Sequence, residues 1–127
     1  MTPIAFRRIH SFFLLLICCC TSFACSPRLQ QEGQASFYSE KLEGHHTASG
    51  SIYHGNALTA AHPTLPFGTK VKVVNQANGQ SVTVHVTDRG PSASTGRIID
   101  LSHKAAKKLG MLTTGVAHVE LYYKKKI

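Results

Sequence analysis

The sequence predicts a mainly β fold, in which about six strands close into a small barrel beside one clear helix. Two segments, 69–75 and 81–87, alternate apolar and polar residues as half-buried strands do, and an Asn-Gly pair between them is typical of a hairpin turn. All 4 cysteines lie before residue 26, so the rest of the chain holds no disulfide. Barrel closure removes the exposed edges of a sheet, which suits a small domain without such cross-links.

Composition narrows the class of protein further. The chain has 127 residues, which is room for one domain. It is 43% hydrophobic and 16% charged, and these values exclude a disordered polyelectrolyte. Its 14 Lys+Arg exceed its 6 Asp+Glu, for a formal net charge of +8, which favours association with an anionic polymer. No aromatic-basic pattern of an RNA-binding domain is present, so we expect no nucleic-acid partner.

The N-terminal residues have the pattern of an export signal. Two arginines precede an apolar run over 12–20, and small residues follow it before Cys25. The run is shorter than the roughly 20 residues of a membrane-spanning helix. We therefore expect a signal peptide over 1–24, with an uncleaved anchor or a buried helix as the alternatives.

Cleavage after Ala24 would place Cys25 where a bacterial lipoprotein carries its lipid. A lipobox usually has an aliphatic residue three places earlier, and this chain has Ser22, so an ordinary signal-peptidase site is the alternative. With a lipid anchor the protein would be a membrane-anchored lipoprotein of the bacterial cell envelope, facing the periplasm. We interpret residues 25–32 as a lipoprotein tether and residues 124–127 as a basic tail.

Local signals define the elements before the hairpin. Residues 34–39 alternate and contain aromatics, which predicts a strand. Residues 44–56 are rich in Gly, Ser, Thr and His and are expected to form a loop. We interpret residues 57–62 as one helical turn that Pro63 ends.

The hairpin and the elements after it have stronger signals. In the second hairpin strand, the valines at 82, 84 and 86 share one face. Residues 97–101 form a short apolar strand. Ser102 is a natural N-cap for a helix over 103–109, and Gly110 is a natural stop. The final strand is expected over 116–123.

Two carboxylates stand apart from the other acidic residues. Asp88 and Asp100 each follow an aliphatic run and end a predicted strand, where partial desolvation would suit proton transfer. The alternative for Asp88 is a turn residue paired with Arg89, and for Asp100 it is a partner of free N–H groups at the helix start. The remaining carboxylates of the mature chain are expected on the solvated surface: Glu32, Glu40, Glu43 and Glu120.

The histidines do not indicate a metal site. His62 lies between apolar residues, where a lone histidine is usually structural. His45, His46, His54 and His62 match no zinc template, and no cysteine accompanies them. We expect no metal and no other cofactor.

Six segments that occur in order resemble the rare lipoprotein A (RlpA) family of septal-ring lytic transglycosylases: 33–38, 47–50, 58–62, 64–69, 88–91 and 96–102. The resemblance implies a six-stranded double-psi β-barrel with one or two short helices over residues 33–123. Expansins and some endoglucanases share this barrel more distantly.

The resemblance also implies an activity and its residues. The substrate would be peptidoglycan glycan strands, cleaved endolytically between N-acetylmuramic acid and N-acetylglucosamine to leave 1,6-anhydromuramic ends, with a preference for strands lacking stem peptides. Asp88 and His62 would carry catalysis, and Asp100 is a second candidate because expansins have an Asp before Leu-Ser. The implied substrate-binding residues are Thr47, Ser51 and Arg89. We expect a monomer.

Ser51 departs from the family pattern. Members usually have Glu at this position, and a hydroxyl can hydrogen-bond but cannot act as a carboxylate. The alternative function is therefore a non-catalytic peptidoglycan-binding module, or an expansin-like module that loosens the wall.

Overall fold

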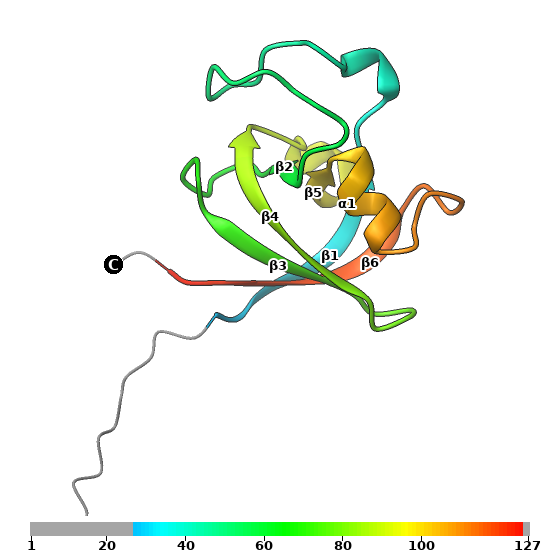
Figure 1. The fold of residues 1–127 in the computed structure, drawn as a ribbon. Coiled ribbons are helices and arrows are strands. Elements are labelled where there is room, and N and C mark those ends of the chain that lie inside the picture. The colour runs from blue at the N-terminus through cyan, green and yellow to red at the C-terminus, as the bar shows by residue number, and fades with distance from the viewer. Residues whose placement is uncertain (1–26, 126–127) are drawn as a thin grey trace, which may run out of the picture.

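The described part of the chain contains six strands, which form a closed barrel. The computed structural model describes residues 27–125, and its strands are β1 (Arg28–Phe37), β2 (Thr59–Ala61), β3 (Lys70–Asn75), β4 (Ser81–Asp88), β5 (Arg97–Leu101) and β6 (Ala117–Tyr123). Their order is β1-β5-β2-β4-β3-β6, and β6 pairs back onto β1 (Figure 1). The predicted mainly β barrel is confirmed.

Helices are few and short in this part of the chain. Between residues 27 and 125 they are α1 (His103–Lys108) and two 3-10 turns, η1 (Glu40–Leu42) and η2 (Ala93–Thr95). None of them is long and apolar enough to cross a membrane. The expected signal peptide over 1–24, the expected lipid site Cys25 and the end of the basic tail at 126–127 lie outside the described residues.

The predicted hairpin is formed by β3 and β4, which pair antiparallel around the turn 76–79. Gly79 adopts a φ of +73°, a conformation that glycine takes without steric cost. The valines at 82, 84 and 86 are buried, as their shared face predicts. The aliphatic core of the barrel includes Val71, Val73, Val82, Val84, Val86, Ile99, Leu101, Val119 and Leu121.

The interpretation of residues 57–62 as a helical turn is wrong, because residues 59–61 form β2. This strand lies between β4, to which it is parallel, and β5, to which it is antiparallel. Ala60 and Ala61 are buried at 0% and 1% exposure. Pairing on both sides satisfies the backbone of β2, and this tertiary context overrides the helix propensity of alanine.

β1 begins at Arg28, so most of the segment interpreted as a tether belongs to the barrel. Residues 28–35 pair antiparallel with β6, and this pairing closes the barrel. The first half of β1 keeps much of its surface in solvent. Its polar composition, which suggested a tether, is that of a strand with a solvated face.

The helix predicted after Ser102 is confirmed as α1. The Ser102 hydroxyl accepts a hydrogen bond from the N–H of Ala105 at 3.3 Å and caps the helix. Leu109 follows as the C-cap, and Gly110 adopts a φ of +67°. Ala105 and Ala106 are buried against the barrel.

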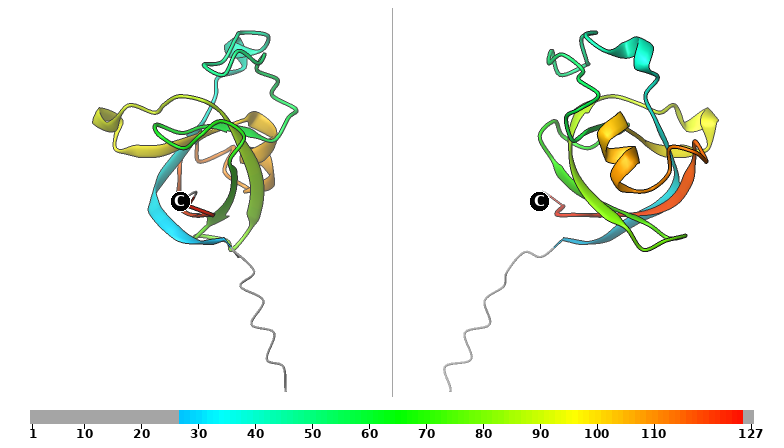
Figure 2. Two further views of the ribbon diagram at one scale, coloured as in Figure 1. Left: turned by 90° about the vertical axis from the view of Figure 1, so that its left-hand side faces the viewer. Right: turned by 45° about the vertical axis from the view of Figure 1, so that its right-hand side comes forward.

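Between β1 and β2 the chain makes a long excursion, residues 38–58, which stands beyond one end of the barrel (Figures 1 and 2). The carboxyl end of β4 points toward it (Figure 1). A bridge between His46 and Ile52 folds the excursion back on itself. The N–H of Ser49 donates to the carbonyl of Thr87 at 3.1 Å, which attaches the excursion to β4.

Candidate active site

Strand pairing places the two singled-out aspartates in one row. Asp88 on β4 pairs with Ala61 on β2, and Ala61 pairs on its other side with Asp100 on β5. Paired residues of neighbouring strands share a face, and adjacent strands lie about 4.8 Å apart. The register therefore places the two aspartates on either side of Ala61, next to a shift in the β2–β4 register between Ala60 and Ala61.

Asp88 is held by three donors. The Tyr38 hydroxyl donates to Oδ2 at 2.6 Å, and the N–H groups of Ala48 and Arg89 donate to Oδ1 at 2.8 and 2.9 Å. Oδ1 therefore has both acceptor positions filled, whereas Oδ2 has one open for a further partner. Asp88 also borders a small hollow, which Thr47 and Tyr53 help to line.

Tyr38 is a site residue that sequence reasoning missed. Burial, and then the hydrogen bond to Asp88, raise the pKa of Tyr38 far above its ordinary value. The phenol is therefore a permanent donor to the carboxylate. Its ring packs edge-to-face on Tyr53, with 4.6 Å between the ring centroids. The only sequence signal for Tyr38 was its place in the family-like segment 33–38.

The ring of His62 faces the protein. Its Nδ1 accepts the N–H groups of Thr64 and Leu65 at 3.2 and 3.1 Å, so Nε2 carries the hydrogen and donates to Gln31 Oε1 at 3.0 Å. The residue is 4% exposed. Its contact with Asp88 runs through the main chain, where the His62 N–H donates to the Asp88 carbonyl at 3.2 Å.

Arg89 supports the loop that follows His62. Its Nη1 donates to the carbonyl of Leu65 at 2.8 Å, and its guanidinium lies 4.1 Å from the centroid of the Phe67 ring. Burial, and then the charge of Arg89, lower the pKa of His62. The structure thus gives Arg89 a role in loop geometry, and the residue is exposed.

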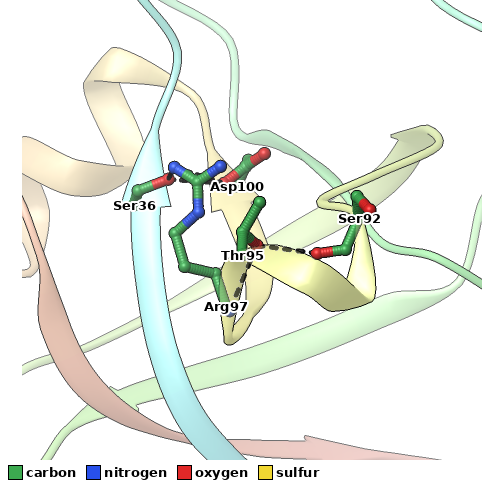
Figure 3. A network of polar contacts seen from close by, with 5 residues as sticks. All are labelled: Ser36, Ser92, Thr95, Arg97 and Asp100. Atoms are coloured by element: carbon green, nitrogen blue, oxygen red, sulfur yellow. Dashed lines mark hydrogen bonds and ion pairs between the residues drawn. The ribbon is translucent and has the colours of Figure 1, made fainter.

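Asp100 belongs to a separate polar network. It accepts the Ser36 hydroxyl and forms an ion pair with Arg97 Nη1 at 3.8 Å, and the same Nη1 donates to Ser36 Oγ at 2.8 Å (Figure 3). The expected alternative, in which Asp100 satisfies N–H groups at the helix start, is wrong because Ser102 caps α1. Within residues 27–125, Asp100 thus has a cationic side chain within 4.0 Å, whereas Asp88 has none.

Three hydroxyls form a triangle on the excursion. Thr47 Oγ1 lies 2.8 Å from Ser51 Oγ, and Ser49 Oγ lies 3.0 and 2.9 Å from these two atoms. The triangle flanks Ala48, whose N–H binds Asp88. The structure therefore brings both Thr47 and Ser51 to the neighbourhood of the carboxylate.

Residues 30–121 match the family model described as lytic transglycolase. A Synechocystis protein named "Probable endolytic peptidoglycan transglycosylase RlpA" is 54% identical over 89 residues, which cover 70% of this chain and 27% of the relative. A Vibrio cholerae protein named "Endolytic peptidoglycan transglycosylase RlpA" is 50% identical over 91 residues, which cover 72% and 34%. The chain thus spans about a third of the length of these curated relatives.

The fold of this chain is also similar to those of solved structures. A Streptomyces papain inhibitor superposes with a TM-score of 0.59 at 26% identity, over 76% of this chain and 97% of that chain. A Clavibacter michiganensis expansin superposes with a TM-score of 0.56 at 21% identity, over 76% of this chain and 50% of that chain. With the closed strand order, these likenesses confirm the six-stranded double-psi β-barrel.

Proposed function

The chain belongs to the lytic transglycolase family, and from this premise we propose that it cleaves peptidoglycan glycan strands with Asp88 as the acid/base. The observation that carries the proposal is the setting of Asp88, which three donors hold beside a hollow with one acceptor position of Oδ2 open. The names of these relatives support the same class of polymer as substrate.

One carboxyl group is enough for this reaction. An ordinary glycosidase uses two carboxyl groups, because water must be activated as well as the leaving group protonated. In lytic transglycosylation Asp88 gives its proton to the glycosidic oxygen as the bond from C1 to that oxygen breaks. The substrate's own 6-hydroxyl then bonds to C1 and returns its proton to Asp88. The product is a 1,6-anhydromuramic end, and no water is consumed.

The surrounding contacts support the assignment of Oδ2 as the reacting atom. The N–H groups of Ala48 and Arg89 fix Oδ1, so the carboxyl group is oriented before substrate arrives. Tyr38 binds Oδ2 from one side and leaves its other lone pair for the substrate.

The other predicted residues receive supporting roles in the proposal. His62 is a positioning residue, since its main-chain N–H holds Asp88 and its ring holds the loop over 62–65. Asp100 is the second acidic candidate, and its ion pair with Arg97 makes it the weaker one. Thr47, which lines the hollow, and Ser51, whose hydroxyl contacts that of Thr47, offer hydroxyls to the sugar.

Substrate preference and location are part of the same proposal. We propose that strands lacking stem peptides are preferred, and that the protein is exported to the cell envelope and anchored through Cys25. The supporting observation for export is the charged, apolar and small-residue pattern over 1–24.

The test uses purified protein on stem-stripped glycan strands, with products identified by mass spectrometry. We expect anhydromuramic products from the native chain and a rate lower by about 1,000-fold for Asp88→Asn, within the range of a lost general acid/base. Asp100→Asn is the matched comparison, and its rate should fall by less than that of Asp88→Asn. Products that persist undiminished in Asp88→Asn contradict the assignment. Strand binding without any product from the native chain would indicate a binding module instead.

A further inference from the structure

A second and larger cleft lies beside Tyr53, close to the hollow that Asp88 borders. Its volume is about 610 Å³, and Tyr53 lines both this cleft and the hollow beside Asp88. The Tyr53 hydroxyl accepts the N–H of His103 at 3.2 Å, which fixes the shared wall to the start of α1. The cleft therefore continues the proposed site at a defined place.

One wall of the cleft is cationic. Lys104 and Lys107 both line it, and they lie on one face of α1 because they are three residues apart. Within residues 27–125, neither ammonium group has a carboxylate partner within 4.0 Å. Lys108 is also exposed on α1 but does not line the cleft.

A second wall is anionic, and Glu40 and Glu43 line it. Glu43 accepts the N–H of Gly55 at 2.6 Å and contacts His54 Nδ1 at 3.1 Å. The hydrogen bond from Gly55, and then that from His54, lower the pKa of Glu43, so the carboxylate stays charged at neutral pH. Carboxylates accept hydrogen bonds, so this wall suits hydroxyl and amide N–H donors.

We propose that the cleft is a subsite for an N-acetylmuramic acid residue whose lactyl carboxylate is free. Lys104 and Lys107 bind that carboxylate, while the 6-hydroxyl on the opposite edge of the sugar ring faces Glu40 and Glu43. The inference rests on the proposed function, because it takes a glycan strand as the ligand. Such a residue carries an anion at its C3 edge and a neutral hydroxyl donor at C6, which matches one cationic and one anionic wall.

The subsite gives a physical basis for recognising stripped strands. A stem peptide converts the lactyl carboxylate into an amide, which removes the negative charge that the lysines attract. An amide also adds bulk at the point where the cleft meets α1. Lys104 and Lys107 are then specificity-determining residues, and they act on binding without touching the reacting atoms.

The test compares two probes of equal length: a stripped glycan-strand oligosaccharide and a chitin oligosaccharide, which has the acetamido sugars but no lactyl carboxylate. Binding is measured at low salt with the Asp88→Asn protein, so that no probe is cleaved. Adding Lys104→Gln and Lys107→Gln should weaken binding of the strand by about tenfold or more, as loss of charge-assisted contacts does. Binding of the chitin probe should not change.

Matched variants complete the design. Lys108→Gln removes the same charge from the same helix and should leave both affinities unchanged, and Lys104→Arg with Lys107→Arg should keep the preference for the strand. Circular dichroism confirms that each variant is folded. If the Lys104→Gln and Lys107→Gln changes weaken binding of both probes equally, or of neither, the proposed subsite is wrong. Absence of anhydromuramic products from the native chain would refute the proposed function but would not alter this binding difference.

Discussion

Both ring nitrogens of His62 are hydrogen bonded within the protein. Nδ1 accepts two main-chain N–H groups and Nε2 donates to Gln31. Protonation of Nδ1 would break both accepted bonds and add a charge near Arg89, which already lowers the pKa of His62 after burial. The ring is therefore neutral, and it shapes the site by holding the loop that follows β2.

This setting predicts a pH-dependent stability. Because the pKa of His62 is lowered in the folded chain, the unfolded chain, with a histidine pKa of about 6.5, binds more protons. The contribution of the neutral His62 ring to the free energy of unfolding is complete above about pH 6.5. It is lost as the pH falls toward the lower pKa that His62 has in the folded chain. Urea unfolding should show that the native chain loses more stability between about pH 7.5 and pH 5 than His62→Asn does, since asparagine keeps an acceptor at the δ position.

The control for this prediction is His85→Asn, because His85 lies on the exposed face of β4. That variant should keep the native pH dependence. If His62→Asn and the native chain lost the same free energy of unfolding across this range, the neutral buried ring would be the wrong description of His62.

At this scale the sequence could identify Asp88 but not its partners. Asp88 follows an apolar strand and carries a family-like motif, and both signals are local. Tyr38 and Ala48 reach it from 50 and 40 positions away in the chain. No local pattern distinguishes an aromatic residue that binds a carboxylate from one that fills the core.

Among the elements, those with local signals were predictable and those fixed by pairing were not. α1 was predicted from its cap, its apolar residues and its terminal glycine, all of which lie within nine positions of the chain. β2 was predicted as a helical turn because its two alanines favour helix in isolation. Only β4 and β5, which flank it in the barrel, make it a strand.

The N-cap of α1 should be essential to a helix this short. Six residues are too few for a stable helix without capping and packing. The buried Ser102 hydroxyl accepts the N–H groups of Ala105 and Thr59 at 3.3 and 3.4 Å. Ser102→Ala leaves both donors without this acceptor and should lower the free energy of unfolding by about 1–2 kcal/mol in urea titration.

Ser94→Ala provides the comparison, because Ser94 lies exposed in η2. Its free energy of unfolding should stay within about 0.5 kcal/mol of the native value. Equal stability of Ser102→Ala and the native chain would mean that packing of the buried alanines alone holds α1.

For the whole molecule, barrel closure depends on residues whose composition suggested a tether. Residues 28–32 pair with β6 from Glu120 to Tyr123, and Gln31 in this segment is the partner of the His62 ring. Tyr123 packs near the same ring, with 6.5 Å between the centroids. The closing pair of strands therefore also supports one side of the candidate site.

A chain shortened to begin at Gly33 tests this closure against one that begins at Ser26. The shorter chain loses the pairing of residues 28–32 with β6 and exposes the edge of that strand. At about 1 kcal/mol per lost hydrogen bond, the free energy of unfolding should fall by about 2–4 kcal/mol, which lowers the melting temperature by about 10 °C or more. Ending the chain at Tyr123 instead removes residues beyond the last pair of β6 and should leave the melting temperature nearly unchanged. If residues 28–32 were a passive tether, chains that begin at Gly33 and Ser26 would have equal melting temperatures. If these residues close the barrel, their loss also weakens the support of His62 and so lowers cleavage of glycan strands.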